Sequence, residues 1–75
     1  MPTVKMVGWK EGLQKIALTN LIKSDAGIGL KEAKKCTDDL VEGKTVYLKG
    51  LSAEAATHFL NEASLIGAVC EIIDD

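Results

Sequence analysis

The sequence predicts a single small α+β domain, β-α-α-β-α-β, in which three helices pack on one face of a three-stranded sheet. Three observations predict it: three segments have apolar residues at helical spacing, three short segments are rich in strand-forming residues, and glycines lie near the joins between them. With only 75 residues, the chain has room for one core, so we expect residues 1–75 to form one domain.

Three segments are expected strands: residues 3–8 (TVKMVG), 45–48 (TVYL) and 68–73 (AVCEII). In the first, alternation places Val4 and Met6 on one side and Lys5 and Val7 on the other. In the third, if Glu71 faces solvent, its neighbours Cys70 and Ile72 face the helices.

Three segments are expected helices because apolar residues recur on one face of each: residues 13–24, 30–40 and 53–66. The predicted core-facing residues are Leu13, Ala17, Leu18, Leu21 and Ile22, then Leu30, Ala33, Cys36, Thr37 and Leu40, then Ala53, Ala56, Phe59, Leu60, Ala63 and Ile66. Ser52 is a good N-cap for the third helix, and Gly67 suits the residue after its end. Gly27 and Gly29 permit a tight turn, so we expect the first two helices to form a hairpin.

The sheet face away from the helices is expected to be apolar. In the expected registers it carries Val7, Trp9, Val46, Leu48, Val69 and Ile73. Because a solvated face rarely carries this many apolar side chains, the pattern predicts a homo-oligomer or another partner on that side.

Charge and composition argue against several classes of protein. The net charge of −2 divides into +4 for residues 1–35 and −6 for residues 36–75. Every basic residue is a lysine, whereas a domain that reads nucleic-acid bases usually carries arginine and an overall basic balance. No apolar run approaches the roughly 20 residues of a membrane span, and the N-terminus lacks the pattern of a signal peptide. We therefore expect a cytoplasmic protein that neither reads nucleic acid directly nor enters a membrane.

No motif indicates catalysis, so we expect no enzyme, no catalytic residue, no metal site and no cofactor. The glycines of AGIGLKEA follow a helix rather than a strand, and Glu32 stands where a dinucleotide fingerprint needs its third glycine. His58, the only histidine, is expected in solvent between Glu54 and Glu62, one helical turn to either side. The two cysteines lack metal-site spacing and are interpreted as buried small apolar residues.

Lysines concentrate around the glycine turn. They are Lys15, Lys23, Lys31, Lys34 and Lys35. Ile16 falls among them, outside the apolar face of its helix. One interpretation is a solvated lysine face with a stray aliphatic residue. The other is an apolar anchor within a basic rim, an arrangement that attracts an acidic protein partner.

Two segments, QKIALTNLIKSDAGIGLKEAKK and GLSAEAATHFLNEASLIGAVCEI, resemble the C-terminal domain of the bacterial large-subunit ribosomal stalk protein. The resemblance covers residues 3–73, and GIGLKEAK is its most specific part. It implies the fold predicted above and a domain that recruits translational GTPase factors and helps to stimulate their GTP hydrolysis. It also implies a contact surface on the first two helices. The matching residues are Lys15, Ile16, Ala17, Lys23, Gly27, Gly29, Lys31 and Lys34.

The chain departs from that family in three respects. Asn20 stands where the family pattern has a lysine, which weakens the basic surface. VEGKTVYLKG replaces a connection rich in proline and alanine. The family's dimerisation domain and hinge are absent from these 75 residues, and Met1-Pro2 is typical of a natural start. We therefore expect a stand-alone relative in which the outer sheet face replaces the dimerisation domain.

Two functions are compatible with this resemblance. The first is a non-enzymatic module that binds a translational GTPase factor or another acidic protein. The alternative is a binding protein like the Clp protease adaptor, which resembles the same fold and binds an unfoldase and destabilising N-termini. That alternative needs an acidic, apolar-lined pocket, and the sequence shows no obvious one.

Overall fold

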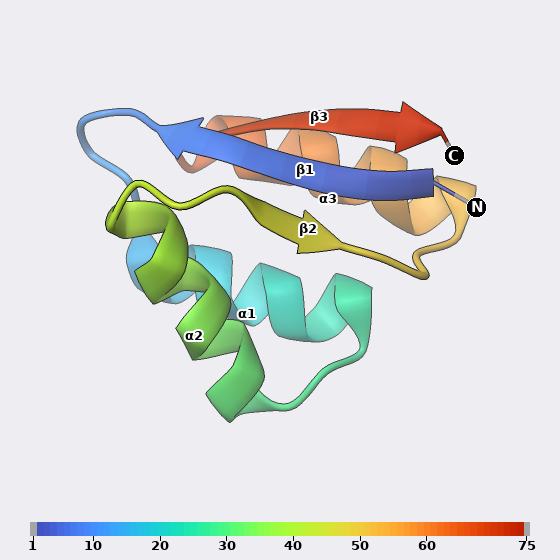
Figure 1. The fold of residues 1–75 in the computed structure, drawn as a ribbon, viewed down its shortest axis with the longest axis horizontal. Helices are drawn as coiled ribbons and strands as arrows, with labels where there is room; N and C mark the ends of the chain where they lie inside the picture. The colour runs from blue at the N-terminus through green and yellow to red at the C-terminus, as the bar shows by residue number, and fades with distance from the viewer. Residues whose placement is uncertain (1, 75) are drawn as a thin grey trace.

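The computed structural model describes residues 2–74 and contains the six expected elements in the expected order (Figure 1). The elements are β1 (Pro2–Trp9), α1 (Lys15–Ala26), α2 (Leu30–Val41), β2 (Val46–Leu48), α3 (Ala53–Leu65) and β3 (Ala68–Asp74). Each boundary lies within two residues of the predicted one, and the α+β class is confirmed.

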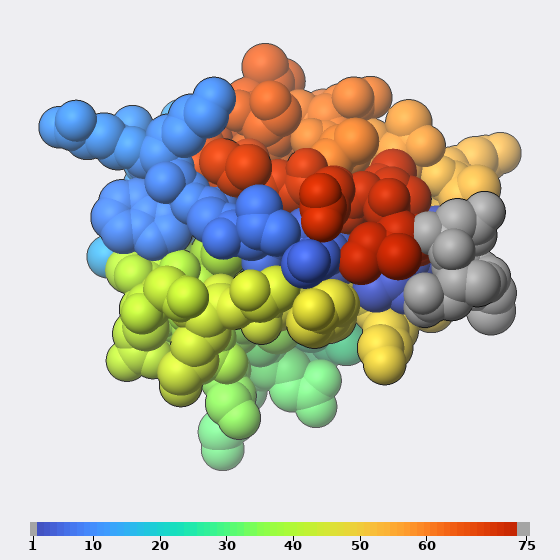
Figure 2. All heavy atoms as spheres, turned by 45° about the horizontal axis from the view of Figure 1, so that its top comes forward, coloured from blue at the N-terminus to red at the C-terminus, as the bar shows by residue number. Residues whose placement is uncertain are grey.

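The sheet has β1 at its centre. The strand order is β2-β1-β3, and β1 pairs antiparallel with both neighbours. The three helices cover one face of the sheet (Figure 1). On the other face the three strands lie side by side at the molecular surface, as Figure 2 shows. This arrangement leaves β2 and β3 as the two edge strands.

The core fills the space between β1 and the helices. Val4 and Met6 of β1 are fully buried, as alternation predicts. Phe59 of α3, the largest fully buried side chain, belongs to the same cluster as Leu18 of α1 and Leu40 of α2. Every helix therefore contributes to a single core beneath the central strand.

The predicted orientation of β2 is wrong. Val46 and Leu48 were expected on the outer face, but both are core residues. Val46 pairs with Met6 and Leu48 with Val4, and paired residues of neighbouring strands point to the same side of a sheet. Tyr47, between them, therefore faces outward and is exposed.

The outer face is more polar than predicted. Tyr47 and Glu71 both lie opposite Lys5, whose Nζ is 3.5 Å from a carboxylate oxygen of Glu71. A bulge between Met6 and Gly8 breaks the alternation of β1, so that Trp9 pairs with Ala68. Val7, Val69 and Ile73 are still expected there, whereas Trp9, paired with the buried Ala68, lies on the helix side by the same rule, partly exposed at the end of its strand. Self-association through the outer face stays a prediction.

Two residues predicted to face the core are exposed instead. Leu30 is 56% exposed, and Ala53 is also exposed. Each is the first residue of its helix. The end of α2 that carries Leu30 lies away from the sheet (Figure 1), so correct helical spacing does not bring Leu30 into the core.

The first two helices form the expected hairpin. Gly27 ends α1 with φ +66°, in the left-handed region that glycine adopts without strain, and its N–H donates to the carbonyl of Lys23. Across the hairpin, the hydroxyls of Thr19 and Thr37 lie 2.8 Å apart, and Thr37 is buried. This hydrogen bond is a direct polar contact between the two helices, beside their packing in the core.

Backbone contacts hold the start of α1 to the corner between α3 and β3. The Lys10 N–H donates to the carbonyl of Gly67 at 2.7 Å, and the Gln14 N–H donates to the carbonyl of Ile66 at 3.0 Å. Gly67 has φ +99°, and a Cβ atom there would lie 3.1 Å from the Cα of Leu13. Glycine is therefore required here both by conformation and by space.

Truncation of Phe59 tests the single core. Phe59→Ala should lower the free energy of unfolding by about 3–5 kcal/mol, measured by urea denaturation, because it leaves a large cavity. Since a loss of that size could unfold so small a domain, Phe59→Leu serves as a milder variant and should cost less than Phe59→Ala, because it leaves a smaller cavity. Leu65→Ala, on the exposed side of α3, should change the free energy of unfolding by no more than about 0.5 kcal/mol.

Candidate functional site

A groove of about 280 Å³ lies between α1 and α2. Residues from both helices line it: Lys15, Ile16, Thr19 and Asn20 from α1, and Leu30, Lys34, Thr37 and Asp38 from α2. The hydrogen-bonded Thr19 and Thr37 join its two walls. The groove is therefore formed where the two helices of the hairpin pack against each other.

Ile16 is the most exposed large apolar side chain among residues 2–74, at 81%. Its exposure follows from the position of α1, because the fully buried Leu18 and Ile22 hold the opposite face of that helix in the core. Leu30 adds a second exposed aliphatic side chain to the same groove, from α2. Two apolar side chains thus lie in water on one surface, where a partner could bury them.

A shallower hollow continues this surface around α1. Ala17 and Asn20 line it together with Lys15 and Ile16. A third hollow, between α1 and α3, again includes Ala17 and Asn20 and reaches His58. Asn20, which replaces a lysine of the family pattern, therefore lies where all three hollows meet.

The predicted site residues are only partly brought together. Lys15, Ile16, Asn20 and Lys34 line the groove, and Ala17 lies beside it. Lys23 and Lys31 are exposed but do not line the groove. Gly27 and Gly29 act through the backbone of the turn, as the C-cap of α1 and the N-cap of α2.

Sequence reasoning missed four groove residues: Thr19, Leu30, Thr37 and Asp38. Leu30 and Thr37 were assigned to the core by their spacing, and Thr37 is indeed buried. Helical spacing identifies which side of a helix is apolar, but it does not identify which residues border a neighbouring helix.

The electrostatic potential at the start of α1 should be positive. Lys15 is the first residue of the helix, no acidic side chain lies in the first turn, and no side chain caps its free N–H groups. The positive end of the helix dipole therefore adds to the lysine charge. On α2, Lys34 contributes a second positive charge to the groove and Asp38 the only negative one. The apolar pair is thus bordered mainly by positive charge.

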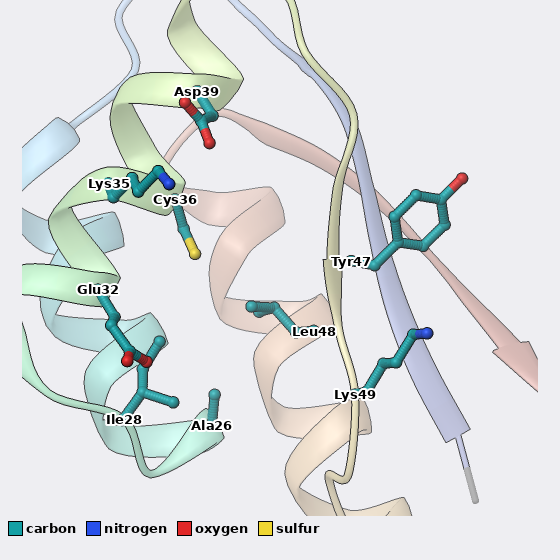
Figure 3. Close-up of a pocket in the computed structure, with 9 residues that line it drawn as sticks. All are labelled: Ala26, Ile28, Glu32, Lys35, Cys36, Asp39, Tyr47, Leu48 and Lys49. Atoms are coloured by element: carbon teal, nitrogen blue, oxygen red, sulfur yellow. The ribbon is translucent and has the colours of Figure 1, made fainter.

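A further hollow, of about 370 Å³, lies on the other flank of α2, between that helix and β2 (Figure 3). Cys36, Glu32, Lys35 and Asp39 contribute to it from α2. Nothing in the sequence analysis indicated this hollow, because its second wall is a strand distant in sequence from the α1–α2 turn. The two grooves therefore share one helix between them.

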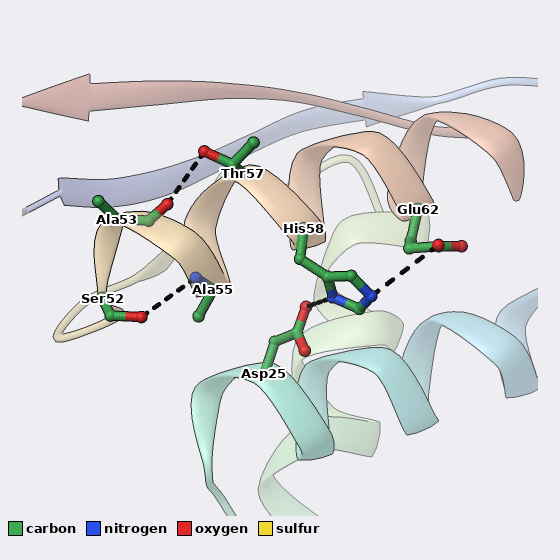
Figure 4. A network of polar contacts seen from close by, with 7 residues as sticks. All are labelled: Asp25, Ser52, Ala53, Ala55, Thr57, His58 and Glu62. Carbon is green, nitrogen blue, oxygen red and sulfur yellow. Dashed lines mark hydrogen bonds and ion pairs between the residues drawn. The ribbon is translucent and has the colours of Figure 1, made fainter.

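His58 joins α3 to the end of α1 (Figure 4). Its Nδ1 lies 2.7 Å from a carboxylate oxygen of Asp25, and its Nε2 lies 3.9 Å from Glu62. The hydrogen bond to Asp25, followed by the negative charge of that carboxylate, raises the pKa of His58 above its usual 6.5. The imidazolium form is therefore favoured in the folded protein.

The closest partner of His58 differs from the prediction. Glu54 and Glu62 were expected on either side, but the closest contact comes from Asp25, 33 residues away. Glu62 is the second contact, and no ion pair joins Glu54 to His58 in the part of the chain that the structure describes. Figure 4 also shows Ser52, whose hydroxyl accepts a hydrogen bond from the Ala55 N–H at 3.1 Å, which confirms the predicted N-cap.

The two cysteines are free and half-buried. Burial raises the pKa of Cys70 to about 11, and burial with the charges of Asp39 and Glu32 raises that of Cys36. Both therefore remain protonated at neutral pH and are poor nucleophiles. Among residues 2–74, no group of three or more His, Cys, Asp and Glu side chains is arranged to hold a metal ion. In the same range, no helix combines the length and apolar character needed to cross a bilayer.

Comparison with known proteins gives one informative similarity. No family model matches the chain. The large ribosomal subunit protein bL12 of Sulfurovum sp. (strain NBC37-1) is 36% identical to it over 61 residues, which are 81% of this chain and 47% of that protein. The chain thus spans about half the length of the curated relative that it matches.

The His58–Asp25 contact predicts a pH-dependent stability. A histidine whose pKa is raised by folding stabilises the protein fully below its unfolded pKa, about 6.5, and this stabilisation is lost as pH rises through the folded pKa. The free energy of unfolding should therefore fall as pH rises from about 6.5 through the folded pKa.

Asp25→Asn should remove most of this dependence of the free energy of unfolding on pH. Glu62→Gln should leave the dependence largely intact, because Glu62 is the more distant partner of His58. Histidine NMR titration of the native protein gives an independent measurement. A His58 pKa at or below 6.5 would contradict the prediction.

Proposed function

Because the chain is a relative of the ribosomal protein bL12 that resembles its C-terminal domain, we propose that it is a non-enzymatic module that binds translational GTPase factors through α1 and α2. The observation that carries this proposal is the 81% exposure of Ile16 beside a lysine-bordered groove. Ile16 does not lie alone, because the exposed Leu30 lines the same groove, and exposed apolar side chains grouped within a polar rim are typical of a protein contact site.

The apolar pair would supply most of the binding energy. Burying an isoleucine or leucine side chain contributes about 1.5–3 kcal/mol, and contact residues that dominate an interface usually lie at its centre. Ile16 and Leu30 have this central position, with Lys15 and Lys34 around them. The groove of about 280 Å³ has room for one or two apolar side chains of a partner.

The lysines would select an acidic partner surface and speed its approach. Charges at the rim of an interface mainly raise the association rate and make it depend on ionic strength. Asn20 lowers the number of such charges by one relative to the family pattern. Association should therefore depend on salt, with Lys15 and Lys34 as the main contributors.

The adaptor-like alternative is not favoured. It needs negative charge around an apolar pocket to hold an N-terminal amine, whereas the α1–α2 groove is bordered by two lysines and one aspartate. The similarity found among known proteins is to a ribosomal protein.

Ile16→Ala tests the anchor. We expect it to weaken binding to a purified translational GTPase in its GTP-bound form by roughly tenfold, by isothermal titration calorimetry, because the contact loses apolar area. Leu65→Ala is the matched control, since Leu65 is an aliphatic residue of similar exposure, 77%, on α3. Equal effects of the two substitutions would reject this surface.

Lys34→Glu tests the basic border, and Lys23→Glu tests whether the contact extends along α1. Both should slow association several-fold at low salt in stopped-flow measurements and leave the circular dichroism spectrum unchanged, because both side chains are exposed. Lys35→Glu, one residue along but on the other flank of α2, should have little effect. Unchanged association in both test variants would contradict the proposed surface.

A further inference from the structure

β3 is the longer of the two edge strands in the described part of the chain. It pairs with β1 on one side only, and its seven residues, Ala68–Asp74, compare with three in β2. The bulge in its pairing adds a residue to β1, between Met6 and Gly8, so β3 itself runs without interruption. Such an edge presents a row of backbone N–H and C=O groups that another strand can pair with.

β3 lacks the features that commonly prevent edge strands from pairing. Folded proteins keep such strands short, place lysine or proline in them, or interrupt them with a bulge. The sequence AVCEIID contains neither lysine nor proline. Val69 on the outer face is 37% exposed. Ile72 is paired with the buried Val4, so it points to the helix side, and it is 38% exposed. Apolar side chains on both sides of the strand are therefore accessible at this edge.

The flank of α3 beside this edge is uncharged. A hollow of about 360 Å³ lies between α3 and β3, which are neighbours at the surface that Figure 2 shows. α3 contributes Leu60, Asn61 and Ser64 to this hollow, and Lys10 is the only charged side chain among the described residues that line it. Asn61 and Ser64 are exposed, so a partner at the β3 edge would also contact α3.

The titratable side chains of α3 lie on another side of that helix. They are Glu54, His58 and Glu62, which recur every four residues and so share one face. His58 contacts Asp25 of α1, so this face is turned toward α1 (Figure 4). The charged face of α3 and its flank beside β3 are therefore distinct.

An uncharged flank favours a second copy of the same chain as the partner. Two copies bring identical side chains together, so charged residues within such a contact repel each other or lose their hydration, and the cores of protein interfaces are depleted of charge. The β2 edge does not meet this condition, because four charged residues line the hollow beside it. At the β3 edge, the carboxylate of Glu71 already lies 3.5 Å from the Nζ of Lys5 in the same chain.

We propose that two copies of this chain form a symmetric dimer in which the two β3 strands pair antiparallel at their free edges. The two three-stranded sheets then form one continuous sheet, with all helices on the same side of it. A strand that pairs antiparallel with its own copy makes a closed two-fold contact, so association stops at the dimer. The flanks of α3 that carry Asn61 approach each other below the paired strands.

Charge limits the register of this pairing. Residues directly opposite each other point to the same side of a sheet, so the two-fold axis must pass between a residue of β3 and the same residue of the copy. An axis at Glu71 would place two carboxylates opposite each other, which is destabilising. An axis at Cys70 places Glu71 opposite Val69 of the second copy, and an axis at Ile72 places it opposite Ile73. We expect one of these two registers.

This dimer is distinct from the contacts described for other faces of the molecule. It uses the edge of the sheet, whereas the association predicted from the sequence uses the outer face. No described residue lines both the hollow beside β3 and the α1–α2 groove, so the dimer leaves that groove free. The contact should be weak, because the molecule measures only 29 × 22 × 20 Å and a standard interface buries roughly 800 Å² per partner.

Sedimentation equilibrium of the full chain between about 10 μM and about 1 mM tests the dimer, and we expect the average mass to rise from that of one chain toward that of two. Asn61→Lys should weaken association by roughly tenfold, because it brings two like charges together across the axis. Asn20→Lys is the matched control, since Asn20 is also exposed, lies on α1 and gains the same charge. Circular dichroism should show both variants folded.

Amide hydrogen exchange, followed by NMR at low and high protein concentration, locates the contact. Exchange in residues 69–73 should slow at high concentration, and Asn61→Lys should remove this effect. Tyr47→Lys, on the outer face of β2, should leave association within about twofold, because Tyr47 is separated from β3 by the central strand. A mass of one chain at the highest concentration, equal effects of the two asparagine substitutions, β3 exchange that is independent of concentration, or loss of association in Tyr47→Lys alone would each overturn the proposal.

Discussion

The burial of one face of β1 is the constraint on which the rest of this structure depends. A three-stranded sheet in a chain of 75 residues has only one face that the chain can cover, and all three helices are used to cover it. Val4 and Met6 define that face, and Phe59, Leu18 and Leu40 fill the space below them. Apolar side chains that point elsewhere, such as Ile16 and Leu30, are therefore left in water.

Most of the fold could be predicted because its signals are local. Helical spacing and the turn glycines identify all three helices to within two residues. The orientation of β2 could not be predicted, because Val46, Tyr47 and Leu48 all suit a strand and none is charged. Only the pairing with β1 decides which of them is buried. The prediction that Leu30 faces the core was wrong for a different reason. Its helical spacing is right, but the end of α2 that carries it lies away from the sheet.

The candidate site was partly visible in the sequence as a local inconsistency, an isoleucine among lysines. The structure adds what spacing cannot show: that Thr19 and Thr37 join the helices, and that Leu30 lies in the same groove. The contact between His58 and Asp25 links residues 33 apart and depends on how α1 crosses α3. The hollow beside β2 likewise depends on tertiary structure. Such features form only when the helices pack together, so no local sequence pattern predicts them.

Gly67 shows how a turn remote from the α1–α2 groove is tied to the segment that leads into α1. Its carbonyl holds Lys10, and its missing side chain leaves room for the backbone of Leu13, two residues before α1 begins. A larger residue would press on the backbone of Leu13, which would have to move by some tenths of an ångström just before the helix that carries Ile16. The start of α1 is thus clamped to the end of α3 through backbone atoms, a fastening that substitutions of side chains in the α1–α2 groove would leave in place.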